Sequence, residues 1–85
     1  MAYKVVLTPA AEREYRKLPD NIRARIRPAL LELEAHPRPK GAKKLGGSKD
    51  RWRVRVGDYR IIYKINDDTK TVTVLRISHR REAYR

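Results

Sequence analysis

The sequence contains no cysteine and only two histidines. Without cysteine neither a disulfide framework nor a thiolate metal site can form, and the separation of His36 from His79 does not match the spacing of zinc ligands. We therefore expect neither a metal nor a cofactor. Long apolar runs are also missing, since no signal peptide is recognisable and no stretch approaches the roughly 20 apolar residues that span a bilayer. These absences favour a cytoplasmic protein.

Acidic residues are few, with 10 Asp and Glu against 22 Lys and Arg, which gives a formal net charge of +12. The excess is concentrated between residues 38 and 64, where ten basic residues accompany two acidic ones. A concentrated positive field attracts polyanions and accelerates their association in a salt-dependent way. On this ground alone the partner is RNA, DNA, an acidic membrane surface or an acidic protein. The plain alternative is that the cations only keep a small domain in solution.

A chain of 85 residues has room for one domain with a thin core, so we expect residues 1–85 to form a single domain. Residues 2–7 have the composition of a strand. Thr8 and Pro9 are typical of an N-cap and a first helical residue, and this first helix is expected to end near Lys17.

A second helix is expected from Asp20 or Asn21, either of which could be its N-cap, to a point just before residue 37. Pro28 lies inside this pattern and is expected to kink or split the helix. Residues 37–50 read as a surface loop, and residues 71–78 as a strand. The predicted fold class is α+β, with two helices on one face of a small, mostly antiparallel four-stranded sheet (β-α-α-β-β-β) and a short C-terminal tail.

Residues 51–65 alternate cationic and apolar side chains on both sides of Gly57-Asp58. This period of two predicts a β-hairpin whose turn has glycine at its first central position. Pairing about that turn gives an apolar face made of Trp52, Val54, Val56, Tyr59, Ile61 and Tyr63. The opposite face carries Arg51, Arg53, Arg55, Arg60 and Lys64, with Ile62 among them. Two helices can cover only one face, so the arginine face is expected to be open to solvent.

Arg53, Arg55 and Arg60 on one open face suit a phosphodiester backbone, because guanidinium stays charged and binds phosphate oxygens in pairs. RNA can also be cleaved by its own 2′-hydroxyl if one group accepts the hydroxyl proton, another protonates the leaving 5′-oxygen, and cations stabilise the transition state. Arginine barely releases a proton and tyrosine is a poor base near neutral pH, so the acid and base are not evident. The C-terminal segment adds His79, Arg80, Arg81 and Tyr84.

Three segments, residues 43–46, 52–63 and 75–84, resemble the RelE branch of the RelE/ParE toxin superfamily, and residues 6–11 and the helix pair fit it too. RelE toxins belong to prokaryotic type II toxin–antitoxin pairs and cut mRNA in the ribosomal A site. The resemblance implies a metal-independent endoribonuclease that acts on the ribosome and inhibits translation. It also implies an acidic, partly disordered RelB-like antitoxin that wraps the helices and covers or displaces the tail, and no membrane partner.

The resemblance further implies residue roles. Arg53 and Arg55 are the strand cations that help to activate the hydroxyl, and Arg60 stabilises the transition state. Arg80 is the acid, with His79 as its competitor, and Tyr84 stacks on or orients the nucleotide. Contacts to the RNA backbone without a catalytic role are implied for Lys43, Lys44, Arg51 and Arg81.

Two other functions fit parts of this pattern. A ParE-like inhibitor of DNA gyrase shares the fold, but that branch generally lacks the combination of strand cations with Arg80 and Tyr84. A non-catalytic RNA-binding protein would keep the basic face without depending on the tail. The strand arginines could then contact the antitoxin or only solvent. Trp52, Tyr59 and Tyr63 are expected to be core residues.

Overall fold

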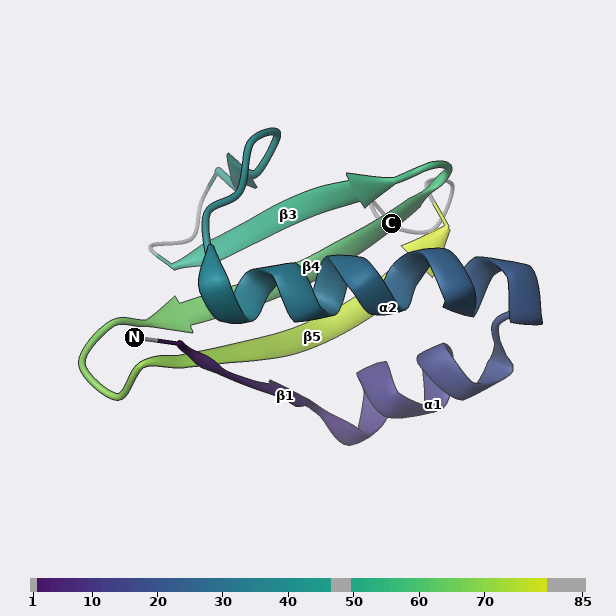
Figure 1. The fold of residues 1–85 in the computed structure, drawn as a ribbon, viewed down its shortest axis with the longest axis horizontal. Helices are drawn as coiled ribbons and strands as arrows, with labels where there is room; N and C mark the ends of the chain where they lie inside the picture. Colours follow the sequence, from purple (N-terminus) through teal and green to yellow (C-terminus); the bar gives the residue numbers. More distant parts are fainter. Residues whose placement is uncertain (1, 47–49, 80–85) are drawn as a thin grey trace.

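The computed structural model describes residues 2–46 and 50–79. They form one sheet with two helices on one of its faces (Figure 1). The elements, in chain order, are β1 (Lys4–Leu7), α1 (Pro9–Lys17), α2 (Asp20–Ala35), β2 (Lys43–Lys44), β3 (Arg51–Val56), β4 (Tyr59–Asn66) and β5 (Thr71–His79). The sheet order is β1-β5-β4-β3-β2, with β1 parallel to β5 and the other pairs antiparallel. This confirms the α+β fold class.

The sheet has five strands because β2 pairs with β3 inside the segment predicted to be a loop. A strand of only two lysines carries no hydrophobic alternation, so the sequence gives no signal for it. Neither described helix is long and apolar enough to cross a membrane.

Thr8 joins the first helix to the sheet. Its hydroxyl oxygen accepts a hydrogen bond from the N–H of Ala11 at 3.2 Å, which confirms the predicted N-cap, and its hydroxyl donates to the carbonyl of Leu75 at 3.2 Å. The N–H of Thr8 donates to the carbonyl of Val74 at 3.0 Å. α1 therefore starts at a fixed point on β5.

The second helix differs from its prediction in two ways. Pro19 occupies the N-cap position and Asp20 is the first helical residue, so the expected side-chain cap from Asp20 or Asn21 is wrong. The helix also continues through Pro28 without splitting. Pro28 is exposed, whereas Ile26 and Leu33 are fully buried, so packing on the opposite side holds the helix together despite the lost hydrogen bond.

The hydrophobic core lies between the helices and one face of the sheet. The apolar face of the hairpin contributes to it as predicted, and Trp52, Val54, Val56 and Tyr59 pack around its margin. The buried residues are Ala11, Ile26, Leu33, Ile61, Tyr63, Ile65, Val72, Val74 and Ile77.

The last part of β5 extends beyond β1, which pairs only with Thr71–Val74. Glu14 of α1 covers this edge. Its carboxylate accepts the backbone N–H of Ile77 at 2.9 Å and forms a salt bridge with Arg76 at 2.9 Å. A backbone donor that the sheet leaves unpaired is therefore satisfied by the helix.

β5 also contains a β-bulge. Ile62 pairs with Arg76 while Tyr63 pairs with Val74, so Leu75 is an extra residue on β5. Side chains alternate between the two faces of a strand, and one extra residue reverses the alternation beyond it. Val72 and Val74 are buried before the bulge, and Ile77 after it.

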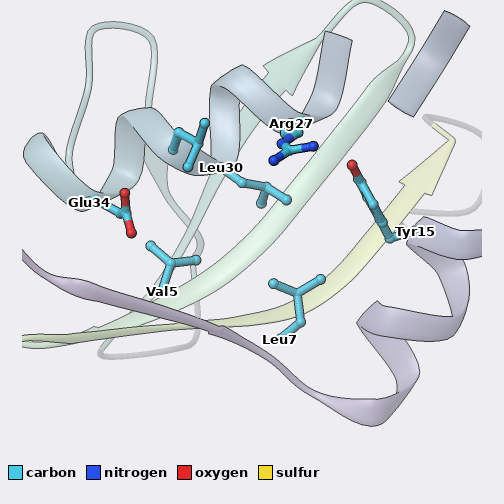
Figure 2. Close-up of a pocket in the computed structure, with 7 residues that line it drawn as sticks. Val5, Leu7, Tyr15, Arg27, Leu30 and Glu34 are labelled. Carbon is cyan, nitrogen blue, oxygen red and sulfur yellow. The ribbon is translucent and has the colours of Figure 1, made fainter. Parts of the chain in front are cut away.

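A groove of about 360 Å³ lies where β1, α1 and α2 meet (Figure 2). Its lining residues are Val5, Leu7, Tyr15, Arg27, Leu30, Leu31 and Glu34. Leu31 is 54% exposed, and it is the exposed large apolar residue among those that the structure describes. β1 is an edge strand, so the groove runs beside an open sheet edge.

Candidate nucleic-acid interface

The hairpin forms with the predicted register. Val56 pairs with Tyr59, Arg55 with Arg60, and Arg53 with Ile62. Gly57 has φ +59°, which glycine adopts without steric cost, and this conformation at the first central position gives a two-residue turn whose twist matches the strands. The turn therefore fixes which side chains share a face.

One row of side chains crosses β3, β4 and β5 on the face turned away from the helices. Arg55 lies opposite Arg60, and Arg60 lies opposite Ser78. Arg55 is exposed, but Arg60 is only 6% exposed and Ser78 only 3%. Arg53 on the same face is half-buried.

The expectation that the whole arginine face is open is therefore wrong for Arg60. Arg60 lies on β4 between Arg55 and Ser78 and interacts with other groups of the chain, whereas Lys64 on the same face of β4 is exposed. A partly desolvated guanidinium with a like-charged residue directly opposite is electrostatically costly. An anion bound between Arg55 and Arg60 would offset that repulsion, so this row is suited to a phosphate.

A second row continues the basic surface beside the first. Lys43 of β2 lies opposite Arg53, Arg53 opposite Ile62, and Ile62 opposite Arg76. Lys43 is therefore on the arginine face, as an RNA-contacting residue would be. Lys44 lies opposite Trp52 and belongs to the other face.

His79 lies on the opposite face from Arg60. It pairs with Tyr59 across the strands, and the two rings meet edge to face with their centroids 5.3 Å apart. Both side chains line a groove of about 280 Å³ together with residues of the α1 end, including Glu14 and Lys17. The structure thus separates His79 from the arginine row, because the bulge on β5 turns Ser78, not His79, toward Arg60.

Of the other site residues predicted from the sequence, one lies among the described residues and three lie outside them. Arg51 is exposed and lies opposite Lys64 on the arginine face. Arg80, Arg81 and Tyr84 lie outside the described residues. Ser78 was not singled out from the sequence, since its place beside Arg60 depends on the β4–β5 register and on the bulge.

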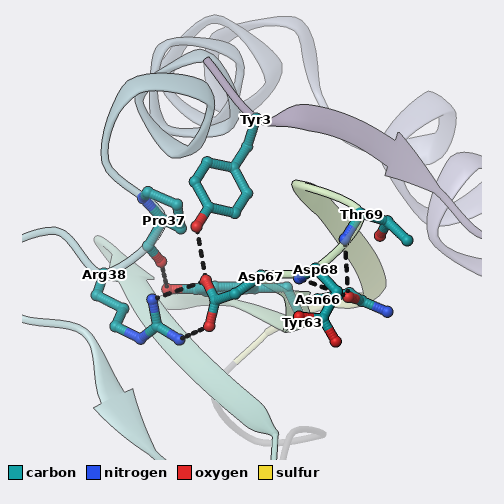
Figure 3. A network of polar contacts seen from close by, with 8 residues as sticks. All are labelled: Tyr3, Pro37, Arg38, Tyr63, Asn66, Asp67, Asp68 and Thr69. Atoms are coloured by element: carbon teal, nitrogen blue, oxygen red, sulfur yellow. Dashed lines mark hydrogen bonds and ion pairs between the residues drawn. The ribbon is translucent and has the colours of Figure 1, made fainter. Parts of the chain in front are cut away.

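A polar network that the sequence did not reveal fixes the segment leading to β2 (Figure 3). Arg38 donates two hydrogen bonds to the carboxylate of Asp67, the shorter at 3.0 Å, and its guanidinium carbon lies 5.3 Å from the centroid of the Trp52 ring. The hydroxyl of Tyr3 donates to the same carboxylate at 2.6 Å. Hydrogen bonds from Arg38 and Tyr3 hold the pKa of Asp67 below its ordinary value.

Tyr63 anchors the same segment from the core side of the sheet. Its hydroxyl donates to the carbonyl of Pro37 at 2.8 Å, and its side chain is fully buried. Burial raises the pKa of Tyr63 to about 12. Tyr63 and Arg38 together position the chain that carries Lys43 onto the edge of β3.

Comparison with known families is decisive for the class of protein. The protein-family model for the ParE toxin of the type II toxin–antitoxin system parDE matches residues 5–84. The chain belongs to the RelE/ParE toxin superfamily. This confirms the resemblance read from the hairpin and the C-terminal segment, and the protein is a type II toxin of the RelE family.

The similarity to individual relatives extends over nearly all of this chain. Toxin RelG of Mycobacterium tuberculosis H37Rv is 36% identical over 89 residues, which cover 100% of this chain and 99% of RelG. The mRNA interferase toxin RelE of Escherichia coli K12 is 29% identical, with 98% of this chain and 88% of that toxin covered. In the crystal structure of the RelE–RelB complex from Pyrococcus horikoshii, a chain matches with a TM-score of 0.84 and 31% identity, covering 98% of this chain and 100% of that chain.

The raised pKa of Tyr63 predicts a loss of stability at alkaline pH. In the unfolded chain this tyrosine ionises near pH 10, but in the folded toxin only near pH 12, so the unfolded state loses its proton first. The contribution of Tyr63 is complete below pH 10 and declines toward pH 12. Urea unfolding of the wild type and Tyr63→Phe across this range should show their difference in unfolding free energy shrinking as pH rises. A constant difference would contradict the assignment, and Tyr15→Phe, at a half-buried tyrosine, is the control.

Proposed function

We propose that this toxin is a ribosome-dependent endoribonuclease that cleaves mRNA in the ribosomal A site and so inhibits translation. The observation that carries the proposal is the row formed by Arg55, the buried Arg60 and Ser78 on the face free of helices. Its charge and its limited exposure suit a phosphodiester in a transition state that gains negative charge. The relationship to the Escherichia coli mRNA interferase toxin RelE supports RNA as the substrate.

The proposed reaction uses the RNA's own 2′-hydroxyl as the nucleophile. The 2′-oxygen attacks the adjacent phosphorus and loses its proton to solvent water, the bond from phosphorus to the 5′-oxygen breaks, and that oxygen receives a proton from the acid. The products are a 2′,3′-cyclic phosphate and a 5′-hydroxyl. Arg60 and Arg55 stabilise the added charge on the phosphate oxygens, and Arg53 supports the same region.

The acid for the leaving oxygen is proposed to be Arg80. His79 is the competing candidate, but its pairing with Tyr59 on the helix-covered face speaks against direct contact with a phosphate held by Arg60. Arg80 and Tyr84 keep the roles that the family resemblance implies, as acid and as the residue that orients the nucleotide. No strong general base lies in the arginine row, so alignment of the mRNA by the ribosome supplies part of the rate.

Inhibition of DNA gyrase is the alternative function, and the ParE name of the matching family model is the observation in its favour. That activity gives no reason for the Arg55–Arg60 pair to face away from the helices beside a buried serine. We therefore place RNA cleavage first. We also propose that residues 1–85 work as one toxin domain in the cytoplasm, where ribosomes are found.

A RelB-like antitoxin is the proposed protein partner, in keeping with the RelE–RelB complex of the Pyrococcus horikoshii relative. The groove lined by Val5, Leu7, Leu30 and Leu31 offers it an apolar anchor beside the open edge of β1 (Figure 2). Arg27 and Glu34 lie at the rim of this groove, as charged residues do around apolar interface cores. An acidic antitoxin would also be attracted by the net charge of +12.

Loss of the buried guanidinium should slow cleavage strongly. In cell-free translation with purified toxin, followed by primer extension on the mRNA, we expect Arg60→Ala to lower the cleavage rate by about 100-fold or more, the usual cost of a lost transition-state cation. Arg13→Ala, at an exposed helix position, is the matched control, and circular dichroism checks that both variants fold. Intact mRNA together with failed DNA supercoiling in the wild-type reaction would instead favour gyrase inhibition.

The two candidate acids can be separated by single-turnover kinetics on programmed ribosomes. We expect Arg80→Ala to reduce the rate at least tenfold more than His79→Ala does, because only a group beside the leaving oxygen can donate to it. Tyr84→Ala is expected to lower the rate as well. A larger loss in His79→Ala would reverse the assignment, and small, equal losses would remove both residues from the mechanism.

The apolar groove should determine antitoxin affinity without affecting cleavage. We expect Leu31→Asp to weaken binding of the cognate antitoxin at least tenfold in calorimetry, because it places a charge in an apolar contact. Glu32→Ala, at the adjacent exposed position, is the control. Unchanged affinity in Leu31→Asp would mean that the antitoxin docks elsewhere.

A further inference from the structure

A polar groove of about 440 Å³ lies where β4 and β5 approach the turn that joins them. Three threonines, Lys64, Asn66 and Asp50 supply its polar side chains. The full lining is Asp50, Lys64, Ile65, Asn66, Thr69, Thr71 and Thr73. None of these residues was assigned a role by sequence or family resemblance.

The groove lies on the same face as the arginine row. Lys64 pairs with Arg51 on one side and with Thr73 on the other, and Asn66 pairs with Thr71. The pairing of β3 with β4 is regular from end to end, so positions 60, 62, 64 and 66 of β4 share one face. Lys64 is four residues from Arg60, about 13 Å along the strand. A single RNA strand passing over the Arg55–Arg60 pair can reach this groove within a few nucleotides.

The chemistry of the groove matches a sugar and phosphate unit. Lys64 is exposed and, with Arg51 opposite, provides positive charge for a phosphate. Thr69 and Thr71 are held by hydrogen bonds to one another, with their hydroxyl oxygens 3.1 Å apart. The side-chain oxygen of Asn66 accepts the N–H groups of Asp68 and Thr69, both at 3.0 Å, which turns its amide nitrogen outward as a donor.

These groups recognise hydroxyls, carbonyls and amino groups of a ribose or base better than they recognise a protein. A protein interface needs a central apolar or aromatic anchor, and Ile65 is the one large apolar residue of this lining and is 7% exposed. The apolar groove beside Leu31 has such anchors and lies on the other side of the sheet. The two grooves are therefore suited to different partners.

We propose that the groove lined by Lys64, Thr71 and Thr73 is a second RNA subsite, which holds a nucleotide of a strand whose cleaved phosphate lies at Arg55 and Arg60. This inference rests on the proposed ribonuclease function. Lys64 contacts the phosphate of the outer nucleotide, and the threonines and Asn66 contact its ribose or base. The subsite fixes the position of the strand along the sheet and adds to affinity without taking part in the chemical step.

Binding of short RNA in the absence of ribosomes tests the subsite. Fluorescence anisotropy would compare a minimal oligoribonucleotide with versions extended one nucleotide at a time at either end. For the wild type, we expect a step of about fivefold or more in affinity when one extension reaches the groove, comparable to the contribution of one well-held nucleotide. Lys64→Gln combined with Thr73→Val should remove that step while leaving the affinity for the minimal oligonucleotide unchanged.

Salt dependence gives an independent measure. Lys64→Gln should lower the slope of log affinity against log salt by about 0.7, the value for one phosphate contact to a single strand. Arg13→Gln, on α1, is the matched control and should retain the affinity step and the slope. A step that persists in the Lys64→Gln, Thr73→Val variant would overturn the proposal, as would a loss of antitoxin binding with unchanged RNA binding.

The source of the RNA can be distinguished on the ribosome. The chain has no cysteine, so Thr69→Cys provides a single attachment point for a hydroxyl-radical probe. Cuts in mRNA near the A site would support the subsite, whereas cuts confined to ribosomal RNA, or no cuts in RNA, would overturn it. If the wild type shows the affinity step but does not cleave mRNA, the proposed function fails and the subsite stands. If mRNA is cleaved and the affinity step is missing, the subsite fails and the proposed function stands.

Discussion

The alternation of side chains along β4 is the constraint on which the rest of the molecule depends. β4 is paired on both sides, and its inward residues Ile61, Tyr63 and Ile65 lie in the core. Its outward residues then include Arg60 and Lys64. A slip of one residue would bury cations in the core at a cost of several kcal/mol each. The stability of the core therefore holds the basic surface in register.

This arrangement assigns the two sides of one thin sheet to different kinds of contact. The helix side carries the apolar groove beside β1, and the opposite side carries the arginine row and the polar groove. An inhibitor docked on the helix side need not compete for the phosphate position directly. Substitutions on one side of the sheet can then change its contacts without altering the other side.

Local sequence signals predicted the parts of the structure that local interactions decide. The N-cap at Thr8 and the hairpin about Gly57 follow from residue type and period two, and both formed as predicted. The face occupied by His79 could not be predicted, because it depends on one extra residue at a bulge between distant strands. The same holds for the contact of Arg38 with Asp67, which are 29 positions apart in the sequence. The burial of Arg60 could not be predicted either, because period two fixes its face but not its exposure, and Lys64 on the same face of β4 is exposed.

The bulge at Leu75 changes which residues of β5 face the core. Before it, the even-numbered residues Val72 and Val74 face the core, and after it the odd-numbered Ile77 does. If Leu75 instead paired regularly with Ile62, Arg76 would lie opposite Ile61 in the core and Ile77 would lie beside Arg60. The bulge therefore decides which face each side chain at the end of β5 occupies, and it keeps Arg76 out of the core and Ser78 beside Arg60.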